Sequence, residues 1–156
     1  MSESIRSFGD LRVFQGGMEA AMEIFELSKG FPPEEKYSLT DQMRKASGSV
    51  CINIGEAWRK PRQGTGFIAK ISDAEGEACE TQVWQLLWNR CRYPDEPTAE
   101  RLFNSYEMVL AQLTKMITGA GQWTIRSAEK SPPPPSRDLP VSASPRRGVP
   151  LPRQEA

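Results

Sequence analysis

The sequence predicts an all-α protein: an antiparallel up-down four-helix bundle followed by a disordered, proline-rich C-terminal tail. Apolar residues recur at steps of three or four through four successive segments, which is the spacing of one helix face. No segment alternates apolar and polar residues convincingly over the length of a strand. Connections of about 5–8 residues between the helical segments suit antiparallel neighbours in a bundle.

The first helix is expected to run from about Asp10 to Lys29. Asp10 suits the N-cap position, and Gly30 followed by Pro32 is a strong stop signal. The apolar stripe that should face the core is formed by Phe14, Met18, Ala21 and Phe25, widened by Ile24 and Leu27.

The second helix is expected from about Leu39 to Trp58. Ser38 and Asp41 resemble a capping box at its start, and Pro61 ends it. Its stripe consists of Leu39, Met43, Ala46, Val50, Ile54 and Ala57. Asn53 lies beside this stripe, and a buried amide must find partners, so it is expected to pair across a helix interface. A functional contact of Asn53 is the alternative.

The third and fourth helices are expected at about Thr65–Arg92 and Thr98–Gly119. The apolar side of the third contains Phe67, Ile71, Ala74, Ala78, Trp84, Leu87, Trp88 and Cys91. The fourth has two adjacent rows, Leu102, Tyr106, Val109, Leu113 and Met116 beside Phe103, Leu110 and Ile117. This apolar arc is wider than a lone bundle needs, which indicates a subunit interface. The alternative is simply a wide core.

The composition changes abruptly near residue 124. Eight of the chain's 13 prolines lie between Ser127 and Ala156, and this segment contains no aromatic residue. Such a composition cannot bury enough apolar surface to offset the entropy of ordering. We therefore predict one bundle domain over residues 8–123 and a disordered tail over residues 124–156.

Composition excludes most kinds of catalytic site. The chain has no histidine, which removes histidine-based acid–base catalysis and most transition-metal sites, and it has no phosphate-binding glycine loop. Its three cysteines form no metal-binding pattern. There is no apolar run of membrane-spanning length and no signal peptide core. We expect a cytoplasmic protein without enzymatic activity, cofactor, metal or membrane contact.

Three carboxylates, Asp73, Glu77 and Glu80, share one face of the third helix. They could bind Mg²⁺ or Ca²⁺, but a solvated face or pairing with Arg44 and Lys45 is the favoured interpretation. Glu56 near the end of the second helix opposes the helix dipole, so a partner such as Arg59 or Arg62 is expected.

The net charge is zero, yet the positive charge is unevenly distributed. Between Arg44 and Lys70 there are six basic residues and one acid. Lysines and arginines at a helix end and in a glycine-containing turn can contact nucleic-acid phosphates, although a solvated charged turn is the simpler alternative. The candidate nucleic-acid-binding residues are Arg44, Lys45, Arg59, Lys60, Arg62 and Lys70.

The chain resembles the 23S ribosomal-RNA intervening-sequence family, which includes the accessory protein of diversity-generating retroelements. The stretches that carry this resemblance are FGDLRVFQ, KGFPPEEKYSLTDQMRKA, SVCINIGEAWRK and DAEGEACETQVW, between about Phe8 and Trp123. The resemblance implies an antiparallel four-helix bundle that assembles as a homopentamer and has no enzymatic activity. For the retroelement accessory protein, it implies binding to nucleic acid and to a reverse transcriptase through a positive surface.

Two hypotheses for function follow. The first is a non-enzymatic, oligomeric bundle that binds RNA or DNA non-specifically through the candidate residues, as an accessory factor to a reverse transcriptase or in association with ribosomal RNA. The second is a protein–protein interaction scaffold without a nucleic-acid site. Because phosphate contacts release counterions, the salt dependence of binding separates the two.

Overall fold

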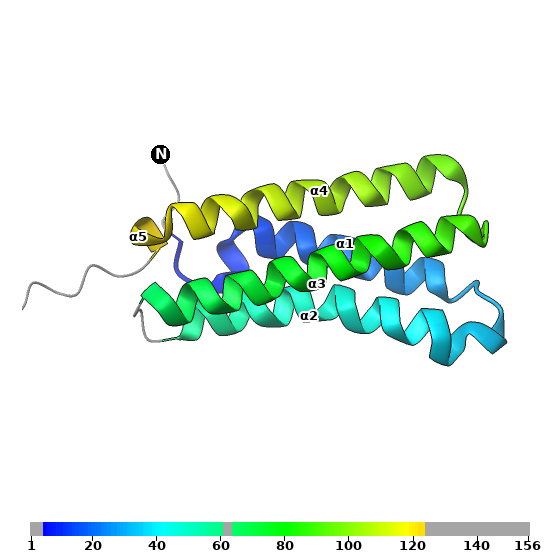
Figure 1. Cartoon of the computed structure of the whole chain (residues 1–156), viewed down its shortest axis with the longest axis horizontal. Helices are drawn as coiled ribbons and strands as arrows, with labels where there is room; N and C mark the ends of the chain where they lie inside the picture. Colours follow the sequence, from blue (N-terminus) through cyan, green and yellow to red (C-terminus); the bar gives the residue numbers. More distant parts are fainter. Residues whose placement is uncertain (1–4, 61–63, 124–156) are drawn as a thin grey trace, which may run out of the picture.

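Four long helices lie side by side and alternate in direction, as predicted (Figure 1). The computed structural model describes residues 5–60 and 64–123. The helices are α1 (Arg12–Ser28), α2 (Asp41–Arg59), α3 (Gly64–Arg90) and α4 (Glu96–Thr118), followed by the short α5 (Ala120–Trp123). Each long helix packs against the next, and α1 also packs against α4, which closes the bundle. The predicted tail lies outside the described residues.

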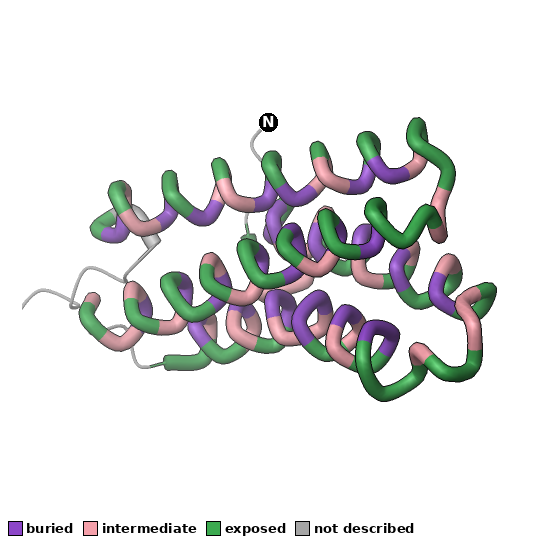
Figure 2. The backbone as a smooth tube through the Cα atoms, turned by 45° about the vertical axis from the view of Figure 1, so that its right-hand side comes forward, coloured by how far each residue is buried: buried purple, intermediate pink, exposed green. Residues whose placement is uncertain are grey.

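The core is built from the inward rows of all four helices (Figure 2). All six residues of the stripe predicted for the second helix are buried, Leu39 in the turn before α2 and the other five in α2, and so is the first predicted row of α4. In the second row of α4, Leu110 and Ile117 pack against the core while partly exposed, and Phe103 is also partly exposed. For α2 and α4 the predicted faces are therefore confirmed.

The main stripe predicted for α1 is displaced by one residue from the buried row, although Ile24, which was predicted to widen it, is buried. The buried positions are Val13, Gly17, Ala20 and Ile24, whereas Met18 and Phe25 remain 40% and 38% exposed. Two apolar rows run side by side on this helix, and periodicity alone does not rank them. The row with small residues faces inward because it lets α1 approach α2 closely: a Cβ at Gly17 would lie 3.3 Å from the Cys51 Sγ.

The second half of α3 also departs from the prediction. Trp88 is buried as expected, but Leu87 is 47% exposed and Cys91 is exposed. The inward positions are taken by Thr81 and Gln85, which continue the alternating steps of three and four that begin at Ala74. The prediction assigned apolar residues to the core even where they leave this row. In the structure, the positions that face the core are set by the helical repeat and not by hydropathy.

The predicted capping contacts were wrong in detail. Asp10 accepts backbone hydrogen bonds from Arg6 (2.8 Å) and Ser7 (2.9 Å) and so caps the 3-10 turn Phe8–Asp10, not α1. Ser38 donates to Glu35 (2.6 Å), and a π turn, Lys36–Thr40, precedes α2. Asn53 is half-buried and donates to the carbonyl of Ser49 in its own helix (3.0 Å), so it does not reach across an interface within this chain.

An aromatic cluster joins the two loops at one end of the bundle. Phe31, in the connection from α1 to α2, contacts the indole of Trp88 edge-on with ring centroids 4.6 Å apart. The same ring lies 5.1 Å from the ring of Tyr93, in the connection from α3 to α4. Tyr93 donates a hydrogen bond to Glu35 (3.1 Å). These contacts tie the loops together at this end of the bundle.

Replacing Gly55 with alanine should stabilise the protein. Gly55 lies inside α2, and a Cβ built there meets no atom within 4 Å. Alanine restricts the unfolded chain without a clash, so we expect the free energy of unfolding to rise by about 0.5–1 kcal/mol. Urea unfolding measures this change. A Cβ at Gly48 likewise meets no atom within 4 Å, so Gly48→Ala should stabilise the protein in the same way. An unchanged or lower urea midpoint for both variants would contradict the prediction.

Candidate nucleic-acid interface

The six predicted residues do not form one cluster. Lys45 and Arg59 lie on the same helix fourteen positions apart, which corresponds to roughly 21 Å along its axis. Arg62 lies outside the described residues. The remaining residues divide into two that are engaged within the bundle and three that face solvent.

Arg44 is engaged at the C-terminal end of α1. Its Nε donates to the Ser28 hydroxyl (2.8 Å), and a terminal nitrogen donates to the carbonyl of Phe25 (3.2 Å). Its guanidinium lies 4.3 Å from the centre of the Phe25 ring. A cation at this position satisfies carbonyls that the end of a helix leaves unpaired and opposes the negative end of the helix dipole. Arg44 therefore holds α2 against α1 and is a poor phosphate ligand.

Lys70 is engaged with two carboxylates. Its Nζ lies 2.8 Å from Glu56 Oε2 and 3.6 Å from Asp73 Oδ2. Among the described residues the partner of Glu56 is thus Lys70 on α3 and not Arg59, while Arg62 lies outside those residues. The hydrogen bond from Lys70 lowers the pKa of Glu56, and the same bond raises the pKa of Lys70.

The Glu56–Lys70 ion pair should make the free energy of unfolding depend on pH. Because the pKa of Glu56 is held below its usual 4.5 in the folded state, the contribution of the pair is complete above that pH and is lost as the pH falls further. In Lys70→Met, the drop in urea midpoint between pH 7 and pH 3 should be smaller than in the original protein. Lys115→Met is the control, and an equal drop in both variants would argue against the pair.

The acidic row of α3 is largely engaged as well. Asp73 is next to Lys70, and Glu80 accepts a hydrogen bond from the Trp84 indole (3.2 Å). Partial burial and the charge of Glu80 raise the pKa of Glu77, while Lys45 acts in the opposite sense. Within the described residues, no group of three or more acidic or cysteine side chains is arranged to hold a metal ion.

Lys45, Arg59 and Lys60 are exposed on α2 and at its end. Three further exposed cations, Arg6, Arg12 and Lys115, were missed in the sequence analysis. In an up-down bundle the start of α1, the end of α2 and the end of α4 share one end, so the topology could have revealed this grouping (Figure 1). We call the set Arg6, Arg12, Arg59, Lys60 and Lys115 the basic end.

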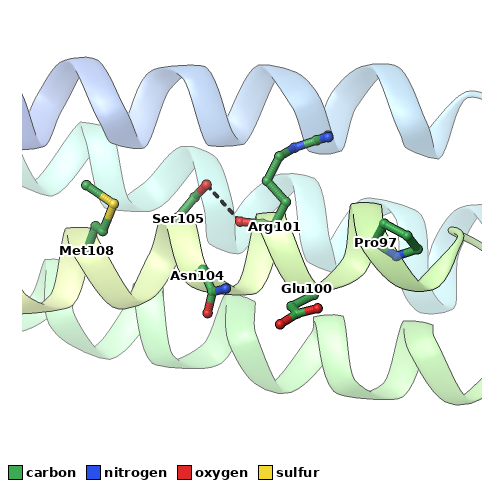
Figure 3. Close-up of a pocket in the computed structure, with 6 residues that line it drawn as sticks. All are labelled: Pro97, Glu100, Arg101, Asn104, Ser105 and Met108. Carbon is green, nitrogen blue, oxygen red and sulfur yellow. Dashed lines mark hydrogen bonds between the residues drawn. The ribbon is translucent and has the colours of Figure 1, made fainter.

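A hollow of about 450 Å³ runs along the outer face of α4 (Figure 3). Its lining residues are Pro97, Glu100, Arg101, Asn104, Ser105 and Met108. All six belong to one helix, and the Arg101 guanidinium pairs with Glu23 on α1. A hollow with a single wall cannot enclose a ligand, so it is not a candidate site.

Comparisons with known proteins agree with the resemblance in the sequence. The model of the family described as 23S rRNA-intervening sequence protein matches residues 9–115. A solved structure from Bacteroides thetaiotaomicron, a protein with unknown function from the S23 ribosomal protein family, is 28% identical, with a TM-score of 0.62. That match covers 68% of this chain and 95% of the other. No curated protein matches the chain. None of the helices in the described segments combines the length and apolarity that a membrane crossing requires.

Proposed function

The chain belongs to the 23S rRNA-intervening sequence protein family, and from this premise we propose that it is a non-enzymatic, self-assembling helical protein that binds RNA through phosphate contacts. Association with ribosomal RNA, or with a reverse transcriptase as its accessory factor, is the setting that this proposal favours. Recognition is non-specific, since the cations face solvent and no base-reading motif accompanies them.

The observation that carries the proposal is that Arg59 and Lys60 are exposed cations without an acidic partner in the described part of the chain. Both are exposed, and neither has a carboxylate within 4.0 Å among the described residues. Unpaired cations at the protein surface gain from phosphate contact because condensed counterions are released. Lys45 is also exposed, but it lies about 21 Å from Arg59 along α2 and is not counted with this pair.

Self-assembly is supported by apolar side chains that one bundle leaves in water, and a homopentamer is the assembly that the family resemblance implies. Ile52 on α2 is 60% exposed, and Val83 and Leu86 on α3 are each 51% exposed. Large apolar side chains left exposed on a soluble helical bundle commonly mark a subunit interface. The same observation favours the second candidate function, a protein–protein scaffold without an RNA site.

Light scattering on the full chain with a short RNA hairpin tests the proposal. We expect the mass of five chains, an increase with RNA at low salt and a return to the protein mass at moderate salt. Arg59→Glu with Lys60→Glu should abolish the increase and leave the protein mass unchanged. A pentamer indifferent to RNA would favour the scaffold, and a monomer would remove self-assembly.

A further inference from the structure

We propose that the RNA-binding surface is the basic end of the bundle, which meets an RNA phosphate backbone end-on and uses Arg6, Arg12 and Lys115 as well as Arg59 and Lys60. This inference rests on the proposed RNA binding and assigns its location and three further ligands. RNA meets the terminal turns of three different helices, whereas the long sides of the bundle are left for other contacts.

The register of the helices brings these cations together. Gly17 of α1 lies against Cys51 and Val50 of α2, so Arg12 lies level with the last turn of α2. The 3-10 turn before α1 also contacts α2, and the backbone of Arg6 donates to Asp10 of that turn, so Arg6 lies at the same end of the bundle. The ion pair between Glu23 of α1 and Arg101 of α4 sets the third register, which puts Lys115 level with the start of α1.

Charge is strongly segregated along the bundle. The basic end region, residues 5–16, 52–60, 64–73 and 110–121, contains six lysines and arginines and three carboxylates. The rest of the described chain contains seven lysines and arginines and thirteen carboxylates. A bundle whose described part is negative overall therefore has one positive end, and a polyanion is attracted to that end and repelled by the remainder.

The three carboxylates in this region are already engaged. Asp10 accepts the backbone N–H groups of Arg6 and Ser7, while Glu56 and Asp73 share Lys70. By contrast, none of the five cations of the basic end has a carboxylate within 4.0 Å among the described residues. The three acids and Lys70 are therefore occupied by contacts within the protein, and five cations stay available to phosphates.

The test is RNA binding by the full chain with charge reversals at the two ends. Arg12→Glu with Lys115→Glu changes the basic end without touching Arg59 or Lys60. The matched control, Lys36→Glu with Arg90→Glu, makes the same change in net charge with exposed residues at the opposite end. Fluorescence anisotropy of a labelled RNA hairpin is measured across salt concentrations, and circular dichroism verifies the helical content of each variant.

We expect the Arg12/Lys115 variant to bind at least ten-fold more weakly than the original protein, with a salt slope smaller by about 1–2. The Lys36/Arg90 control should stay within about two-fold, because unspecific repulsion alone would affect both variants equally. Equal weakening of the two variants, or none in the first, would overturn the end-on surface while RNA binding itself stands. An original protein that binds no RNA would overturn the proposed function together with this inference.

Discussion

Trp88→Ala should lower the free energy of unfolding by about 3–5 kcal/mol. The indole is 1% exposed and contacts Phe31, which in turn contacts Tyr93. Its removal leaves a cavity and takes away the edge-on partner of Phe31, which is the ring that contacts Tyr93 of the other loop. For a domain of this size the loss is a large part of the total stability.

Urea unfolding measures the effect, and Trp84→Ala provides the control. Trp84 lies one turn earlier on α3, is half-buried and donates to Glu80 at the surface. Its truncation should cost clearly less than that of Trp88. Equal losses in the two variants would show that the aromatic cluster contributes nothing beyond the area of one tryptophan.

In contrast to Trp88→Ala, Gln85→Met should stabilise the protein and raise the free energy of unfolding by about 1–3 kcal/mol. Gln85 is 2% exposed, and both atoms of its amide lack a hydrogen-bond partner among the described residues. A buried amide without partners costs about 1–3 kcal/mol in lost hydration, and methionine fills the same volume without polar atoms. The measurement is again urea unfolding.

Tyr106→Phe, on the adjacent helix α4, gives the comparison for Gln85→Met. The Tyr106 hydroxyl is buried and makes no hydrogen bond of normal geometry among the described residues. Burial raises its pKa well above the usual range, while the Ser47 hydroxyl acts in the opposite sense. Each variant removes polar atoms from the same core, so both should stabilise. A loss of stability in both would mean that Gln85 and Tyr106 are hydrogen-bonded in solution, directly or through an internal water.

The parts of the fold that could be predicted are those where one apolar row stands alone. α2 is such a helix, and its buried face follows directly from the spacing of its apolar residues. On α1 two rows compete, and the outcome depends on how closely Gly17 lets the neighbouring helix approach. On α3 the inward row contains Gln85, a residue that hydropathy places outside.

The candidate site, like the fold, could be predicted only in part from the sequence. The exposure of Arg59 and Lys60 follows from their position at the end of a helix. The pairing of Lys70 with Glu56, and the position of Arg44 over Phe25, require the side-by-side register of two helices, which a single sequence does not reveal. Homopentamer formation and the partners of the protein remain predictions.

The two ends of the bundle differ in charge, and the length of α3 sets the distance between them. Its 27 residues separate the basic end from the aromatic cluster by about 40 Å. If RNA binds at the basic end as proposed, the far end should keep its shape, because the aromatic cluster ties its loops together. The bundle then acts as a spacer of fixed length, which would present any protein bound at the far end at one set distance from the phosphate chain.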